Sequence, residues 1–183
     1  MADVDRRALR QRLIATQAAF HGLLDGITED DLRRRSGNPA WSVGAVLSHL
    51  VWSLELLPRE VAGARKGKGM YNFPPVVRDW LNAQLTRLGA RGQTLQTLRQ
   101  RYGAALAIAL VTLDDVRDDE FRLGAHFWSE GFRDIEGLLA AQVDHLAEHE
   151  PDVRLVVPRL ALAANAVETA AAVRLPTNGR AEA

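Results

Sequence analysis

Three histidines have the chemistry and the spacing that a metal site requires. His145 and His149 are four residues apart, so on a helix their imidazoles lie on one face, about one turn from each other. His49 lies in an earlier apolar segment and can bring a third imidazole from a neighbouring helix. Three protein ligands leave a coordination position open for water or substrate, as in catalytic metal sites. The sequence therefore predicts a divalent metal ion on this histidine triad.

The alternative for each histidine alone is a buried core residue whose ring nitrogens are satisfied by hydrogen bonds. Three unligated imidazoles would bury several polar atoms together, at about 1 to 3 kcal/mol for each unsatisfied group, and this cost favours a shared metal. A metal-bound imidazole usually presents its second nitrogen to a carboxylate or carbonyl. Gln142, Asp144 and Glu148 are candidates for that partner, although a solvated polar face explains them equally well. His21 and His126 are expected at the surface or beside the site.

A competing interpretation is a zinc peptidase. The segment from His145 to His149 also fits the pattern H-x-x-E-H, in which Glu148 would be the general base and Glu168 the third ligand. Against it, Pro151 and an alanine-rich segment intervene before Glu168, and no strand is predicted that could bind an extended peptide. We therefore rank a zinc hydrolase below the three-histidine site.

Composition narrows the class of protein. The length of 183 residues predicts one domain, which is large enough to bury a stable hydrophobic core without disulfides or a structural metal. The absence of cysteine excludes disulfides and fits a reducing, cytoplasmic location. With 23 basic and 23 acidic residues, no broad positive surface for nucleic acid is expected. No segment reaches the ~18 apolar residues of a membrane span, and the charged N-terminus does not have the pattern of a secretory signal.

The spacing of apolar residues predicts an all-helical chain. Alternating patterns are nearly absent, and Ser42 is a good N-cap for the helix that carries His49. Pro151 is expected to end or kink the helix that carries the other two histidines. The expected helices cover residues 4–26, 42–61, 75–88, the segment from the break at 89–92 to about 115, and 130–150, with a further alanine-rich helix at 161–173 and a frayed tail at 175–183.

A faint internal repeat suggests how the helices are arranged. Residues 27–32 resemble residues 116–121, and each segment leads through a tryptophan into a helix with a histidine followed by leucine, His49 in the first half and His145 in the second. The repeat predicts two helix pairs related by a pseudo-two-fold axis. His49 and His145 would then face each other across the core, which is how helix bundles build metal sites.

These segments resemble the DinB-like superfamily, which includes the N-terminal domains of mycothiol-dependent maleylpyruvate isomerases and the bacillithiol transferases. Residues 39–50 are similar to that family's tryptophan-serine helix start, which leads into a first ligand, and residues 145–149 are similar to its late histidine pair. The resemblance covers residues 4–150. The proline at 151, where relatives continue the helix, and the tail beyond it depart from the pattern.

The resemblance implies an up-down-down-up four-helix bundle over residues 1–150, with an extra short helix. Residues 151–183 lie beyond the resemblance, and we expect them to form a C-terminal extension packed on the bundle, with a flexible end. It also implies zinc or nickel on His49, His145 and His149, a homodimer, and thiol-transfer or thiol-dependent chemistry.

The leading hypothesis for function is a metal-dependent thiol transferase or thiol-dependent isomerase acting on a small-molecule substrate. A divalent ion would lower the pKa of a bound thiol or water. Because the chain has no cysteine, the thiol would be a low-molecular-weight cosubstrate. The alternative is a non-catalytic module that binds a small ligand or serves in a stress response.

Four aromatic residues are candidates for the walls of a substrate pocket: Trp52, Phe73, Trp80 and Trp128. Aromatic residues at helical spacing are more often part of the core, so both interpretations stay open. The glycine-rich loop at 63–73 is expected to be a mobile wall of the site.

Overall fold

The computed structural model describes residues 4–69, 73–127 and 131–157. Within them the helical class predicted from the sequence is confirmed. The α-helices are α1 (Arg6–Asp25), α2 (Val43–Ala64), α3 (Pro75–Gly89), α4 (Leu95–Asp115) and α5 (Ile135–Arg154), joined by the 3-10 turns η1 (Asp31–Arg33) and η2 (Asp118–Glu120) and the strands β1 (Gly124–Phe127) and β2 (Gly131–Asp134).

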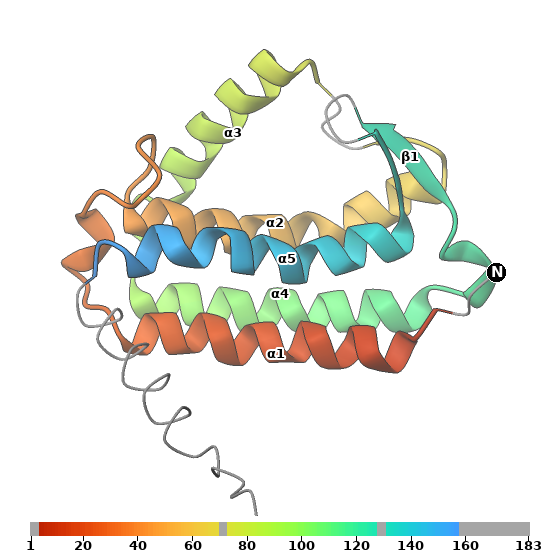
Figure 1. The fold of residues 1–183 in the computed structure, drawn as a ribbon, viewed down its shortest axis with the longest axis horizontal. Helices are drawn as coiled ribbons and strands as arrows, with labels where there is room; N and C mark the ends of the chain where they lie inside the picture. The colour runs from red at the N-terminus through yellow and green to blue at the C-terminus, as the bar shows by residue number, and fades with distance from the viewer. Residues whose placement is uncertain (1–3, 70–72, 128–130, 158–183) are drawn as a thin grey trace, which may run out of the picture.

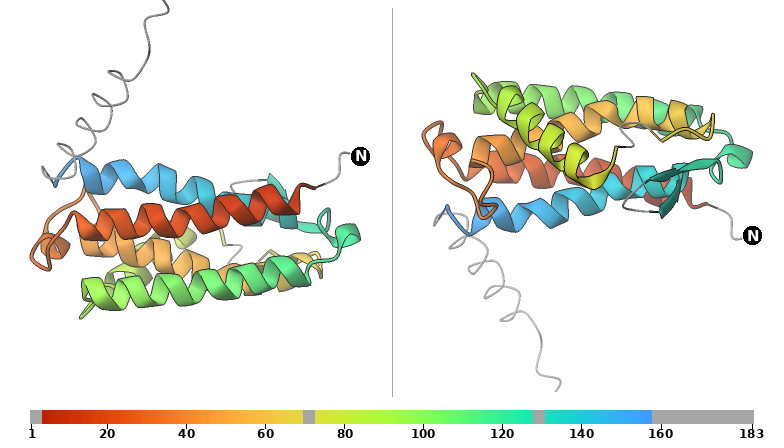
Figure 2. Two further views of the ribbon diagram at one scale, coloured as in Figure 1. Left: turned by 90° about the horizontal axis from the view of Figure 1, so that it is seen from below. Right: turned by 90° about the horizontal axis from the view of Figure 1, so that it is seen from above.

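The four long helices form a bundle in which α1 and α2 each pack against both α4 and α5. Figure 1 shows α1 and α5 running in one direction and α2 and α4 in the opposite direction. The core between them is apolar and fully buried, and includes Leu13, Phe20, Leu47, Leu57, Leu98, Leu113 and Leu139. The shorter helix α3 crosses α2 at an angle on the outside of the bundle (Figures 1 and 2).

Local signals explain where the helices carrying the histidines begin. The Ser42 side chain accepts a hydrogen bond from the N–H of Ala45 and caps α2, as predicted. Asp134 caps α5 in the same way by accepting from Gly137. These caps fix the first turns of α2 and α5, which pack side by side and carry all three histidines of the triad.

The segment before α5 corrects the prediction of a helix from residue 130. Residues 131–134 form β2, which pairs antiparallel with β1, and α5 starts only at Ile135. Gly124 permits this pairing, because a Cβ there would lie 2.3 Å from the carbonyl oxygen of Arg133. Each strand has only four residues, too few for an alternating pattern to stand out in the sequence.

Of the two outcomes expected at Pro151, an end or a kink of the helix, the end is wrong, since α5 continues through Pro151 to Arg154. Proline removes one backbone donor from the helix. The last turn is nevertheless held in place, because Val153 and Val157 are fully buried in the core and Leu155 N–H donates to the Pro151 carbonyl. Trp128, the helix predicted at 161–173 and the tail at 175–183 lie outside the described residues.

The internal repeat corresponds to the same local turn in both halves. In the first copy, Asp31 Oδ2 accepts from the backbone N–H of Thr28 at 2.8 Å. In the second, Glu120 Oε2 accepts from the backbone N–H of Arg117 at 3.0 Å. Each carboxylate is buried at a 3-10 turn, and a buried apolar residue follows it. The repeated sequence therefore encodes a capped turn that leads out of a long helix.

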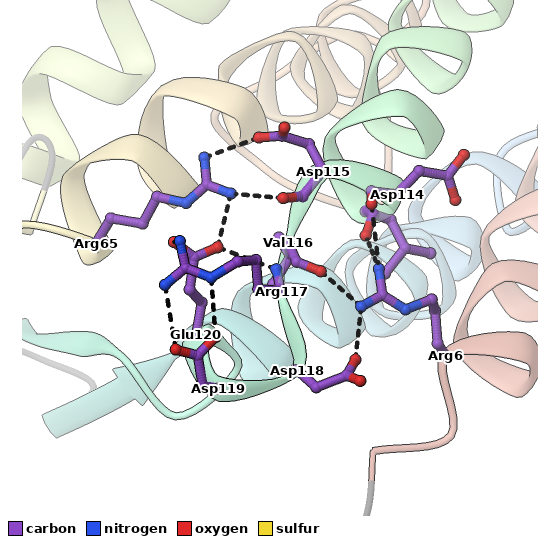
Figure 3. Close-up of polar contacts among 10 residues, drawn as sticks. Arg6, Arg65, Asp114, Asp115, Val116, Arg117, Asp118, Asp119 and Glu120 are labelled. Atoms are coloured by element: carbon purple, nitrogen blue, oxygen red, sulfur yellow. Dashed lines mark hydrogen bonds and ion pairs between the residues drawn. The ribbon is translucent and has the colours of Figure 1, made fainter.

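A polar network closes the end of the bundle where α4 meets η2 (Figure 3). The Arg6 guanidinium donates to the carbonyls of Leu113 and Val116 and to Asp118. Arg65, just after α2, donates to Glu120 at 3.0 Å. Because arginines bind the carbonyls that a helix leaves unpaired at its C-terminus, this network joins α1 and α2 to the chain that leads into the β-hairpin.

Candidate metal centre

The structure brings the three predicted histidines together. His49 comes from α2 and His145 and His149 from α5, and one ligand atom from each lies within 4.8 Å of the others. The Nε2 atoms of His49 and His145 are 3.0 Å apart. All three ring pairs meet in edge or near-edge geometry, which lets nitrogens from the three rings face a common point. Within the described residues this is the group of side chains that could hold a metal ion.

Trp41 closes one side of the cluster. Its ring centroid lies 4.7 Å from that of His49 and 5.8 Å from that of His149. The indole is nearly buried. The Trp41 carbonyl accepts a hydrogen bond from the Ser36 N–H, and the Trp41 N–H donates to the Asn38 carbonyl. The tryptophan of the predicted helix start therefore shields the histidines from water on this side.

Two of the three imidazoles have a hydrogen-bond partner for their outer nitrogen. His149 Nδ1 is 3.0 Å from Asp152 Oδ2, and His145 Nδ1 is 2.9 Å from Ser53 Oγ. His49 Nδ1 is buried and has no hydrogen-bond partner among the described residues. Because the partners of His145 and His149 contact Nδ1, the Nε2 atom of each ring can face the centre of the cluster.

Those partners differ from the ones expected from the sequence. Gln142 lines the pocket, and its Oε1 accepts a hydrogen bond from Ser53 Oγ at 3.1 Å. Asp144 pairs instead with Arg12 on α1, at 3.3 Å. Glu148 lines the adjacent pocket. The actual partners are a serine on the other helix and an aspartate one turn beyond the pair.

Burial favours the neutral form of His49 and of His145. Desolvation, with the nearby His145 and His149 as lesser causes, lowers the pKa of His49 to about 3. Desolvation and then His149 lower the pKa of His145 to about 4. A neutral imidazole has a lone pair on one ring nitrogen, which is the form that binds a metal. Three such nitrogens, with no thiolate or carboxylate among them, fit zinc, nickel or another divalent transition metal.

A pocket of about 780 Å³ opens beside the cluster. All three histidines line it, so the cluster lies in its wall. The other walls come from α2, α5, α3 and the β-hairpin, and both α3 and the hairpin lie on the α2–α5 side of the bundle (Figure 1). An ion on the three nitrogens would thus have protein on one side and the pocket on the other, which keeps a coordination position open to a small molecule.

Comparison with known proteins places the fold. A family model of the DinB superfamily matches residues 12–150. The chain belongs to the DinB superfamily. A search of curated proteins gives no match to it.

Two solved structures resemble this DinB protein. One is a mycothiol-dependent maleylpyruvate isomerase, with a TM-score of 0.67 and 14% identity, matched over 92% of this chain and 72% of that one. The other is a histidine-to-alanine mutant of a mycothiol-dependent maleylpyruvate isomerase, with a TM-score of 0.66, 12% identity and the same 92% and 72% coverage. At these identities the likeness shows a shared fold. None of the helices in the described part of this DinB protein is long and apolar enough to cross a membrane.

The sequence indicated some of the aromatic residues that line the pocket but not others. Trp52 and Phe73 line it, as anticipated for the aromatic residues. Trp80 is 62% exposed and is not among the lining residues. Phe127 and Phe132 line the pocket from the hairpin, and no sequence signal indicated them because the hairpin itself was not predicted.

Proposed function

We propose that this DinB protein is a metal-dependent enzyme that holds zinc or nickel on His49, His145 and His149 and uses a low-molecular-weight thiol for transfer or isomerisation. The observation that carries the proposal is the position of the three histidines in the wall of a 780 Å³ pocket. A structural metal site would be closed by a fourth protein ligand, whereas these three ligand atoms border a space large enough for a substrate.

The residues around the site have separable tasks in this proposal. A divalent ion bound there would supply Lewis acidity and lower the pKa of a thiol or water in the open position. Trp41 excludes water behind the histidines. Trp52, Phe127 and Phe132 offer apolar and aromatic surface to a substrate. The chain has no cysteine, so a sulfur nucleophile has to enter the pocket with a second small molecule.

The thiol is the part of the proposal that the comparison supports. The isomerase with the shared fold is described as mycothiol-dependent. Mycothiol and bacillithiol are therefore the first thiols to test with this protein. The homodimer that the family resemblance implies is a further proposal, and light scattering of the full chain tests it.

The experiment begins with elemental analysis of protein purified without a histidine tag, followed by loading with zinc or nickel. Each form is mixed with a thiol and an electrophile such as a haloarene, and the rate of thioether formation is measured. We expect a metal-dependent rate that disappears in His49→Ala. His126→Ala is the matched control, because His126 is exposed on β1 and does not line the pocket. An occupied site with no rate for any thiol contradicts the enzyme.

A second candidate is a non-catalytic module that binds a small ligand. The 3.0 Å contact between His49 and His145 favours it, because a direct hydrogen bond would satisfy two ring nitrogens without a metal. Ligand binding that is unchanged by chelators would support this module over the enzyme.

A further inference from the structure

Asp152 determines which nitrogen of His149 carries a proton. A carboxylate has no proton of its own and only accepts hydrogen bonds. The 3.0 Å contact between Asp152 Oδ2 and His149 Nδ1 therefore requires N–H at Nδ1. The two side chains are 24% and 18% exposed, so water competes little for this contact. A neutral His149 held in this way has its lone pair on Nε2.

Ser53 does the same for His145 through a different geometry. Its Oγ lies 3.1 Å from Gln142 Oε1 and 3.4 Å from the Leu50 carbonyl, and both of these oxygens are acceptors. The hydroxyl proton therefore points toward one of them. The Oγ lone pair is then left to accept from His145 Nδ1, which is 2.9 Å away. His145 is thus also Nδ1-protonated, with a bare Nε2.

His49 lacks any such support. In the part of the chain that the structure describes, its Nδ1 is buried without a partner, and its ring is oriented by packing between Trp41 and His145. Because His145 Nε2 is bare, the 3.0 Å contact between the two Nε2 atoms makes His49 the donor in the metal-free protein. Only His49 would have to move its proton to the other nitrogen when a metal binds.

The loop before α2 holds Asp152 in place. The N–H of Gly37 donates to the Asp152 carbonyl at 2.7 Å. A Cβ at position 37 would lie 3.1 Å from Asp152 Oδ1 and 3.1 Å from its Cα, closer than ordinary van der Waals contact. A side chain at position 37 would therefore push against the carboxylate that contacts His149.

We infer that Asp152 and Ser53 are positioning residues that preset two of the three ligands, His149 and His145, for metal binding, and that Gly37 maintains Asp152. Partners of this kind orient a ligating imidazole and raise its basicity, and their loss typically costs about 10- to 100-fold in metal affinity. The inference rests on the proposed function for the role of the ion, while the protonation pattern belongs to the metal-free protein.

The first test measures the affinity for zinc and for nickel by competition with a chromophoric chelator. We expect Asp152→Ala and Ser53→Ala each to weaken binding by about 10- to 100-fold, Gly37→Ala to weaken it in the same direction, and Ser53→Thr, which keeps the hydroxyl, to restore it. Glu150→Ala is the matched control, because Glu150 lies at the same end of α5 but pairs with Arg154. Circular dichroism checks the fold, and Asp152→Leu, which is similar in size and has no acceptor, replaces the alanine variant if that variant unfolds.

The second test needs no metal. Nitrogen-15 chemical shifts of the imidazoles report which ring nitrogen is protonated. We expect Nδ1–H at His149 and His145 in the wild type, and a shift toward Nε2–H at His149 in Asp152→Ala but not in Glu150→Ala. Unchanged protonation and wild-type affinity in Asp152→Ala would overturn the inference. A wild type that shows the expected protonation and the expected metal affinities but no reaction with any thiol would overturn the proposed function alone.

Discussion

The Nε2 atoms of His49 and His145 lie 3.0 Å apart, although 96 residues separate the two histidines in the sequence. The contact crosses the interface between α2 and α5. At this distance the two nitrogens can share a proton or an ion, but two protonated rings would repel each other. The stability of the protein should therefore respond to both pH and metal.

Acid should destabilise the metal-free protein through these rings. The pKa of His49 falls from 6.5 to about 3 in the folded protein because of burial, and that of His145 falls from 6.5 to about 4. Between these values the unfolded chain binds more protons than the folded one, so stability is complete above about pH 6.5 and decreases as the pH falls. Thermal unfolding from pH 7.5 to 4.5 measures this effect.

In that experiment the stability of His49→Gln should depend less steeply on pH than that of the wild type, because the variant lacks one of the two imidazoles whose pKa is lowered by folding. His126→Gln, with its exposed position on β1, should retain the wild-type slope. Identical slopes in all three proteins would show that the buried rings do not control the acid response.

Zinc or nickel should stabilise the folded protein. A ligand present at 100 times its Kd and bound only by the folded state adds about 2.7 kcal/mol, which corresponds to a rise in Tm of roughly 5 to 10 °C for a domain of this size. His145→Ala should abolish the rise and remain helical, because the core is apolar and the site lies at its edge. Unfolding of the wild type by a chelator would instead indicate a structural metal.

Replacement of Arg6 should weaken the end of the bundle. Its guanidinium binds two carbonyls near the end of α4 as well as Asp118. Because these are hydrogen bonds of a partly exposed charged group, we expect Arg6→Ala to lower the free energy of unfolding by about 1 to 2 kcal/mol. The neighbouring Arg10 makes an ion pair with Asp114 in which both side chains are well exposed, so Arg10→Ala should cost less than about 1 kcal/mol. Urea unfolding of both variants compares the two, and equal losses would contradict this assignment.

The hairpin should affect the pocket without affecting the metal centre. A Cβ in Gly124→Ala would clash with the backbone of Arg133 and displace the strand that carries Phe132 into the pocket wall. We expect weaker substrate binding, seen as a higher KM in the thiol assay, with zinc affinity unchanged. Gly22→Ala is the control, because a Cβ there meets no atom within 4 Å. Loss of zinc affinity in Gly124→Ala would show that the two parts are coupled.

The sequence by itself determined the features that depend on near neighbours. The spacing of apolar residues over one or two turns indicated all five α-helices of the described residues, and the Ser42 cap was recognised from residue type alone. The i, i+4 spacing of His145 and His149 placed both on one face of α5. These signals are readable because a helix is stabilised by contacts within three or four residues along the chain.

Only the tertiary structure decided which groups from other elements surround the histidines. Ser53 reaches His145 across 92 residues, and the loop at Gly37 meets Asp152 from the other end of the chain. The continuation of α5 through Pro151 depends on the burial of Val153 in the core. Such contacts are set by how α2 and α5 pack against each other, and a pattern of residue types along one helix contains no information about the register of its neighbour.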